Sequence, residues 1–303
     1  MQLDVNLSKL KLKNPILTAS GTFGYGLEYQ QYGELDSLGG MVVKGLSLKP
    51  RKGNPMPRIA ETSCGMLNAI GLQNIGARAF VEQKLPNLPW DKTAVIANLY
   101  AQQCSEFAEL AGYLAAQEGI AALEVNISCP NVKQGGLQFG QDPVMAAEVC
   151  QAVKDRAGSK PVIVKLSPNV TNIVQIAQKL EQAGADCLSL INTLSAMAVD
   201  IYSRKPKLAN GIGGLSGPAI KPVALRMVYQ VCQAVSIPVI GIGGIVSAED
   251  ILEFILVGAH AVQIGSANFI SPDRSFTLVK ELEELCAKLD ISNWADFRGK
   301  VQI

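Results

Sequence analysis

Eight short runs of apolar and β-branched residues recur along the chain, and stretches with helical character separate them. The runs are continuously apolar and do not alternate with polar residues, which is typical of parallel strands that are covered on both faces. This pattern predicts an α/β protein with a parallel sheet. In chain order the runs are "PILTASG", "GMVVKGLS", "TAVIANLY", "AALEVNIS", "PVIVKLS", "CLSLINT", "PVIGIGG" and "AVQIGSA".

The segments between the runs carry helix signals. In "TNIVQIAQKLEQAGAD", Thr171 is a candidate N-cap, Ile173 and Ile176 share one face, and Gly184 is a candidate end. "SAEDILEFILVGAH" has the same punctuation, with Ser247 as the expected cap. Strands therefore alternate with helices along the whole chain.

Eight βα units without a linker or a break in composition favour a single (β/α)8 TIM barrel, over residues 1–303, rather than a doubly wound sheet. The opening "LDVNLSKLKLKNP" predicts an N-terminal β-hairpin that closes the bottom of the barrel. The stretch from about 192 to 218 is too long for a simple βα loop. Because loops that follow barrel strands lie on the catalytic face, we expect long loops there.

Charge and hydrophobicity exclude several classes of partner. The chain has 27 basic and 26 acidic residues, a net charge of +1, so we expect neither nucleic acid nor an anionic membrane as a partner. Hydrophobic residues make up 48%, but no apolar run reaches the roughly 18 residues of a membrane span. The first residues do not form a signal peptide pattern, so we expect a cytoplasmic protein with a large core.

Seven cysteines and one histidine limit the chemistry. The cysteines stand at 64, 104, 129, 150, 187, 232 and 286, and none of these spacings is that of a metal or iron–sulfur site. The sequence therefore predicts no metal site in this chain. His260 is the only histidine, so a general base near neutral pH is expected to be another group.

Polar residues gather at the carboxyl ends of the predicted strands. Parallel strands of a barrel end on one face, so these side chains are expected to form one catalytic rim. The two lysines matter most, because a lysine at the end of a buried strand usually has an anionic partner or a perturbed pKa. The rim residues are Ser20, Lys44, Asn98, Asn126, Lys165, Asn192 and Thr193.

The last two strands end in "GIGG" (241–244) and "GSA" (265–267). In barrels the loops after strands seven and eight commonly bind phosphate through free N–H groups. A phosphate site, two strand-end lysines and several amides suit flavin mononucleotide (FMN), with Lys165 stabilising the charge of the reduced ring. A Schiff-base lysine in an aldolase-like barrel is the alternative role for Lys165. A nicotinamide site is not indicated, because the dinucleotide fingerprint is lacking.

Cys129 stands between a strand and a proline in "EVNISCPN". Pro130 restricts Cys129 to extended conformations. A thiol has a pKa of about 8.5, which is within tuning range of a general base. The Gly-rich "NVKQGGLQFG" that follows is a candidate lid. The alternative is a small, inert buried cysteine, and that alternative suits the helical and strand-interior cysteines better.

Together, these motifs resemble the class 1 dihydroorotate dehydrogenases over nearly the whole chain. The resemblance is carried by "NPILTASGTFGYG", "GNPMPRIAET", "MLNAIGLQNIG", "EVNISCPNVKQGG", "SLINT", "GGLSGPAIKP" and "PVIGIGGI". It implies an FMN-containing barrel that oxidises (S)-dihydroorotate to orotate in de novo pyrimidine biosynthesis. It also implies that Cys129 removes the C5 proton while hydride passes from C6 to FMN N5.

The resemblance also assigns the contacts of cofactor and substrate. The implied FMN contacts are Ser20, Lys44, Gly45, Asn98, Asn126, Lys165, Ile191, Gly217, Gly243, Gly244, Gly265 and Ser266. The implied substrate contacts are Lys44, Asn68, Ala69, Ile70, Gly71, Leu72, Asn126, Asn192 and Thr193.

Within class 1, "EVNISCPNVKQGG" and "ASGTFGYG" resemble the subclass that passes electrons to NAD. That resemblance implies an electron-transfer subunit carrying FAD and a [2Fe–2S] cluster, in a heterotetramer of two catalytic and two electron-transfer subunits. The fumarate-using homodimer subclass shares the cysteine base and is the alternative. Membrane-bound class 2 enzymes, which use a serine base, are less similar.

Overall fold

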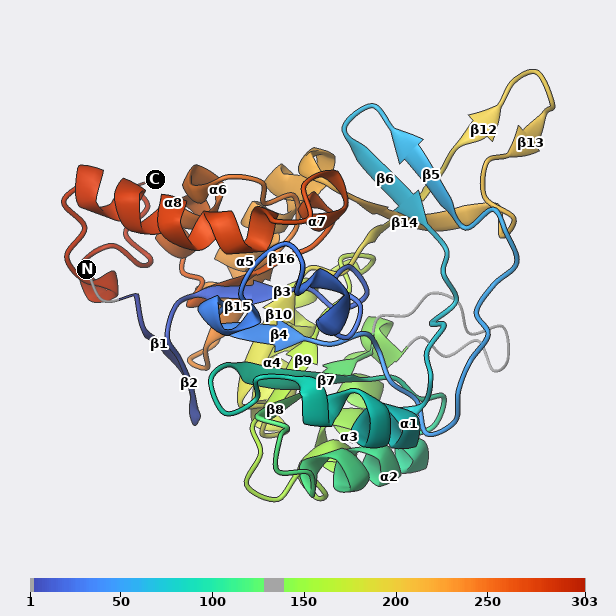
Figure 1. The fold of residues 1–303 in the computed structure, drawn as a ribbon, viewed down its shortest axis with the longest axis horizontal. Coiled ribbons are helices and arrows are strands. Elements are labelled where there is room, and N and C mark those ends of the chain that lie inside the picture. The colour runs from blue at the N-terminus through green and yellow to red at the C-terminus, as the bar shows by residue number, and fades with distance from the viewer. Residues whose placement is uncertain (1–2, 128–138, 303) are drawn as a thin grey trace.

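A closed barrel of eight parallel strands forms the centre of the computed structural model, which describes residues 3–127 and 139–302. Figure 1 shows the barrel with its helices around it. Each predicted apolar run contains one barrel strand, so the predicted (β/α)8 fold is confirmed. The strands are β3 (Ile16–Thr18), β4 (Gly40–Val42), β7 (Ala94–Leu99), β8 (Ala122–Asn126), β9 (Val162–Lys165), β10 (Cys187–Leu190), β15 (Val239–Ile242) and β16 (Ala261–Ile264).

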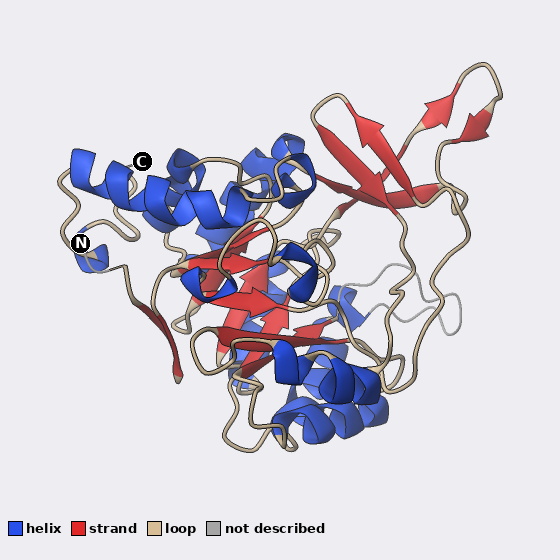
Figure 2. Cartoon of the chain, in the orientation of Figure 1, coloured by secondary structure: helices blue, strands red, loops and turns tan. Residues whose placement is uncertain are grey.

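The helices pack outside the barrel strands (Figure 2). In α4, Ile173, Ile176 and Leu180 are buried, as their spacing predicts. Its N-cap is Asn172 and not Thr171, because the Asn172 side chain accepts a hydrogen bond from the Gln175 N–H. The α-helices are α1 (Ala77–Gln83), α2 (Cys104–Ala115), α3 (Pro143–Lys154), α4 (Ile173–Gln182), α5 (Lys221–Cys232), α6 (Ala248–Leu256), α7 (Ala267–Ile270) and α8 (Arg274–Lys288).

Helix α6 begins with a capping box. The Ser247 hydroxyl accepts from the Asp250 N–H, and the Asp250 carboxylate accepts from the Ser247 N–H, so two N–H groups at the helix start are satisfied. This confirms Ser247 as the cap. No helix in residues 3–127 and 139–302 is long and apolar enough to cross a membrane.

The amino-terminal end of the barrel is closed by the predicted β-hairpin. Strands β1 (Val5–Leu7) and β2 (Leu10–Leu12) pair antiparallel, with Val5 opposite Leu12. The C-terminal segment packs against them, since the Trp294 indole Nε1 donates to the Leu3 carbonyl at 3.4 Å. In Figure 1 the hairpin and both chain ends lie on the left of the barrel.

A second sheet stands at the carboxyl ends of the barrel strands, on the right in Figure 1. Its strands come from the loops after β4 and β10, and their order is β11-β14-β6-β5. The long loops predicted on the catalytic face are thus confirmed, and they contain the strands of this sheet. The strands are β5 (Ile59–Thr62), β6 (Gly65–Asn68), β11 (Leu194–Met197) and β14 (Ile212–Ser216), and β12 (Val199–Asp200) and β13 (Lys205–Pro206) form a separate hairpin.

Six short 3-10 helices complete the described chain. They are η1 (Leu27–Tyr29), η2 (Leu35–Ser37), η3 (Leu85–Asn87), η4 (Phe139–Gln141), η5 (Pro218–Ile220) and η6 (Trp294–Asp296). Of these, η5 leads directly into α5 beside the loops that follow β15 and β16.

Candidate active site

A cavity of about 410 Å³ lies at the carboxyl ends of the barrel strands, beneath the second sheet. Its floor and walls come from strand ends such as Asn98 and Lys165, and its outer side comes from β6 and β14 through Asn68 and Ser216. A volume in the range of about 300 to 1,000 Å³ is usual for a small-molecule site. The cavity is therefore of a size to hold an organic cofactor or substrate.

The contacts expected from the sequence lie around this one cavity, although they come from segments far apart in the chain. Expected FMN contacts on its wall are Ser20, Lys44, Gly45, Asn98, Asn126, Lys165, Ile191, Gly217, Gly243, Gly244, Gly265 and Ser266. Expected substrate contacts on its wall are Lys44, Asn68, Ile70, Gly71, Leu72, Asn126, Asn192 and Thr193. The expected base, Cys129, lies outside the described residues.

Ala69 does not line the cavity. It is 2% exposed and packs with Leu67 and Leu208 in a small apolar cluster of the second sheet. Its N–H donates to the Arg58 carbonyl at 2.8 Å, and its carbonyl accepts from Asn54 Nδ2 at 2.9 Å. Its neighbours Asn68 and Ile70 do line the cavity, because alternate residues of an extended chain face the same side.

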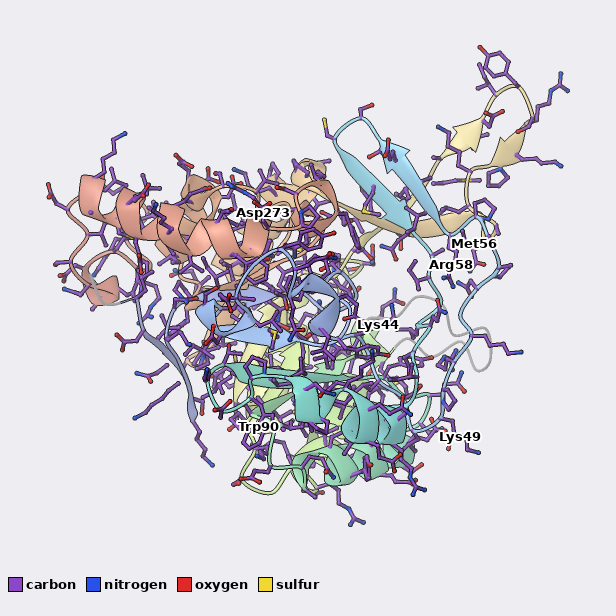
Figure 3. The ribbon with its side chains drawn as sticks, in the orientation of Figure 1. Lys44, Lys49, Met56, Arg58, Trp90 and Asp273 are labelled. Carbon is purple, nitrogen blue, oxygen red and sulfur yellow. The ribbon has the colours of Figure 1, made fainter. Side chains whose placement is uncertain are left out.

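Several lining residues were not among the expected contacts. Arg58 lies on the segment before β5, and Lys44 follows the end of β4; both line the cavity and are labelled in Figure 3. The Arg58 guanidinium donates to Gln73 Oε1 at 2.7 Å, which joins two cavity residues. The arginine in "GNPMPRIAET" and its proline-rich surroundings were a usable signal for a binding loop.

The Lys44 ammonium sits in an environment that disfavours its charge. Burial is the main cause that lowers the pKa of Lys44, and the nearby Arg58 guanidinium lowers it further, while Glu28 acts in the opposite direction. An anion bound between Lys44 and Arg58 relieves both effects. This side of the cavity therefore favours a negatively charged ligand.

Amide side chains from other strand ends also line the cavity. Asn126 and Lys165 are register partners at the ends of β8 and β9, and they are 9% and 5% exposed. Asn192 Nδ2 donates to Asn126 Oδ1 at 3.3 Å, and the Thr193 N–H donates to Asn192 Oδ1 at 2.9 Å. These contacts hold the amides in place, which suits recognition of a ligand with several N–H and C=O groups.

Glycines form a cradle where the loops after β10 and β15 meet. Gly217 and Gly244 have φ of +101° and +72°, values that favour glycine. A Cβ at Gly244 would lie 2.8 Å from the Gly217 carbonyl oxygen, and one at Gly217 would lie 2.6 Å from Gly65 Cα. The backbones of these loops therefore pack closely together, and Gly217 and Gly244 both line the cavity, as suits a phosphate-binding loop.

The positive charge of Lys221, which lies next to this cradle, is neutralised by two carboxylates. Its ammonium pairs with the carboxylates of Asp250 and Glu253, the latter at 2.9 Å. An anion in the cradle would therefore depend on backbone N–H groups rather than on the Lys221 charge.

The donor and acceptor set fits FMN. Asn98 Oδ1 is buried and has no hydrogen-bond partner among the described residues, so it is an acceptor that awaits a donor from a ligand. The cradle suits the phosphate, and Lys165 suits the edge of a ring that gains negative charge. No group of three or more His, Cys, Asp or Glu side chains within 3–127 and 139–302 is arranged to hold a metal ion.

A cavity at the carboxyl ends of parallel strands is the place of the active site in α/β-barrel enzymes. Within that class, the chain belongs to the dihydroorotate dehydrogenase family, whose family model matches residues 2–286.

Curated relatives support this membership over the full chain. A protein of Solidesulfovibrio magneticus named dihydroorotate dehydrogenase B (NAD(+)), catalytic subunit, is 68% identical over 299 residues, which cover 99% of this chain and 98% of that protein. Proteins with the same name from Maridesulfovibrio salexigens and Geotalea daltonii are 63% and 57% identical over 303 and 301 residues. These alignments cover 100% and 99% of this chain, and 99% and 98% of those proteins.

Proposed function

We propose that this chain is the catalytic subunit of an NAD-linked dihydroorotate dehydrogenase. It oxidises (S)-dihydroorotate to orotate in de novo pyrimidine biosynthesis, with FMN in the strand-end cavity. The observation that carries the proposal is that the contacts expected for FMN and substrate, with the exception of Ala69, line one cavity wherever the chain is described.

The reaction removes a proton from substrate C5 and a hydride from C6. Bound FMN supplies the acceptor for the hydride. Cys129 removes the proton as thiolate, and Lys44 and Asn68 hold the substrate at the outer side of the cavity. The other substrate contacts are Asn126, Asn192 and Thr193. Hydrogen bonds link these three residues, since Asn192 Nδ2 donates to Asn126 Oδ1 and the Thr193 N–H donates to Asn192 Oδ1.

Electrons then leave through a second subunit that carries FAD and a [2Fe–2S] cluster and reduces NAD. The proposed assembly is a heterotetramer of two catalytic and two electron-transfer subunits. Support comes from the relatives' shared name, which specifies NAD(+) and a catalytic subunit. The cytoplasm is the proposed compartment, since the described cysteines are free thiols, as is usual in a reducing environment.

Bleaching of the flavin tests the proposal directly. The purified chain is expected to be yellow, and its colour is expected to bleach on anaerobic addition of dihydroorotate. A colourless protein that does not take up FMN contradicts the proposal, and a yellow protein that does not bleach indicates a flavin-binding barrel without this activity. Trapping of a substrate on Lys165 by borohydride would indicate the Schiff-base alternative instead.

A further inference from the structure

Glu124 is a carboxylate in the middle of the barrel. It lies in β8 and is 0% exposed, although its strand neighbours Leu123 and Val125 are apolar. A buried carboxylate is costly unless it is fully hydrogen-bonded, and an apolar residue of the same size is usually as good for stability. Packing alone therefore does not explain a glutamate at this position.

Three donors from three other strands converge on this carboxylate. Asn98 Nδ2 donates to Oε1 at 2.8 Å, and Ser189 Oγ and Gln263 Nε2 donate to Oε2 at 2.9 and 2.6 Å. Glu124, Ser189 and Gln263 come from alternate strands of the closed barrel, β8, β10 and β16, which is how one layer of a barrel interior is built. Asn98 links this polar layer to the cavity that it lines.

The carboxylate determines which end of the Asn98 amide faces the cavity. A carboxylate only accepts hydrogen bonds, so the NH₂ end of Asn98 must face Glu124. The oxygen end then points away, and a Cβ at the cavity residue Gly45 would lie 3.0 Å from Asn98 Oδ1. That oxygen is buried without a hydrogen-bond partner among the described residues.

We propose that Glu124 is a positioning residue: it fixes the Asn98 amide with its oxygen toward the cavity, where that oxygen accepts a hydrogen bond from an N–H of the flavin ring. The inference rests on the proposed function, since it requires FMN in this cavity. Without Glu124 the amide is free to turn, and its NH₂ end then meets the ring N–H as donor against donor.

The test is FMN affinity, measured by quenching of FMN fluorescence on titration with apoprotein. Glu124→Met removes the acceptors at nearly constant volume and is expected to weaken binding about tenfold, the effect of about 1.4 kcal/mol. Asn98→Ala is expected to weaken it similarly. The double variant is expected to bind like Asn98→Ala alone, because Glu124 acts through Asn98.

Two variants separate this role from a purely structural one. Glu124→Gln keeps an oxygen for Asn98 Nδ2 and is expected to retain most of the affinity. Ser189→Ala removes a donor to the other carboxylate oxygen and is the matched control, expected to bind as the unmodified chain does. Thermal unfolding of each apoprotein shows whether stability and affinity change together.

The proposal is overturned if Glu124→Met binds FMN normally, or if its loss and that of Asn98→Ala add in the double variant. If Glu124→Met does not fold, the FMN affinity of Asn98→Asp tests the proposal instead. The carboxylate introduced there faces Glu124, so this variant should bind FMN poorly. Adding Glu124→Gln should restore affinity at least tenfold, since the introduced glutamine amide then donates to the introduced aspartate carboxylate. No restoration rejects the role.

The same titrations distinguish failure of this inference from failure of the proposed function. An unmodified chain that binds no FMN refutes the proposed function as well. Normal bleaching together with an unaffected Glu124→Met refutes this inference alone.

Discussion

At the scale of single residues, the proposed chemistry depends on one thiol. Cys129 follows the cavity residue Asn126 by three positions and precedes Pro130. Replacing it with serine keeps the size of the side chain but raises the pKa of the base far above that of a thiol. The proposed mechanism gives Cys129 no part in holding FMN, so we expect flavin content and proton removal to be separable.

We expect Cys129→Ser to retain FMN and to slow flavin reduction by dihydroorotate about 10²- to 10⁴-fold, the usual contribution of a general base. The remaining activity should rise toward higher pH, because serine is a far weaker acid than cysteine. Anaerobic stopped-flow absorbance of the flavin measures both effects. Cys150→Ser is the control, since that buried thiol lies in α3 and has a pKa raised to about 12 by burial. A Cys129→Ser enzyme that reduces its flavin at the normal rate contradicts the role.

The single histidine gives a prediction about stability. Burial, aided by the nearby Arg298 guanidinium, lowers the pKa of His260 from 6.5 to about 4. Between these two values the unfolded chain binds the proton and the folded chain does not, so stability falls as pH falls through this window. The contribution is on the order of 3 kcal/mol, since one pKa unit corresponds to about 1.36 kcal/mol.

The measurement for His260 is the free energy of unfolding in urea at pH 7 and pH 4. The unmodified chain is expected to lose more stability over this range than His260→Gln, which has no proton to take up. The carboxyl groups titrate in both proteins, so their effect on the free energy of unfolding cancels in the comparison. Equal losses in the two proteins would show that the histidine does not contribute.

At the scale of elements, the C-terminal segment closes the amino-terminal end of the barrel. Trp294 in η6 is 8% exposed, and its indole N–H donates to the Leu3 carbonyl beside the β1–β2 hairpin. The Gly299 and Val301 N–H groups donate to carbonyls at the end of α6, at 3.1 and 3.2 Å. The tail thus joins the hairpin to the helical layer, far from the cavity.

Trp294→Ala is expected to destabilise the chain by about 3 kcal/mol, since it leaves a cavity the size of an indole in the core. FMN affinity should not change in the protein that remains folded, because the site lies at the other end of the barrel. Urea unfolding and flavin titration measure the two effects. Trp90, labelled in Figure 3, is the only other tryptophan. It is 38% exposed, so Trp90→Ala is the control and should cost less stability. A similar loss in both variants contradicts this role of the tail.

Local patterns predicted the barrel, the polar rim and the Gly-rich turns after the last two strands, because parallel strands place their carboxyl ends on one face; the family resemblance supplied the other contacts. They did not predict the pairing of β6 with β14, in which Asn68 lies opposite Gly214, since that register depends on contacts between distant segments. The alternation that turns Ala69 away follows from this pairing. Glu124 was also missed, because a single carboxylate inside an apolar run gives no sign of the three donors it meets.

At the scale of the whole molecule, the route of the electrons decides between two subclasses. A fumarate-using homodimer would oxidise dihydroorotate catalytically by itself. An NAD-linked catalytic subunit needs a second chain, because "GIGG" lacks the acidic partner of a dinucleotide site and the cysteine spacings are not those of cluster ligands. The relatives' name, which includes NAD(+), favours the second case.

We expect the chain alone to be reduced once by dihydroorotate and then to turn over with neither NAD⁺ nor fumarate. Addition of the electron-transfer subunit should restore continuous NADH formation, followed by absorbance at saturating dihydroorotate. Light scattering of the mixture should give the mass of two catalytic chains, each of 32.2 kDa, with two partner chains. Rapid turnover of the chain alone with fumarate would assign it to the homodimer subclass, and NADH formed by the chain alone would show that the second subunit is not needed.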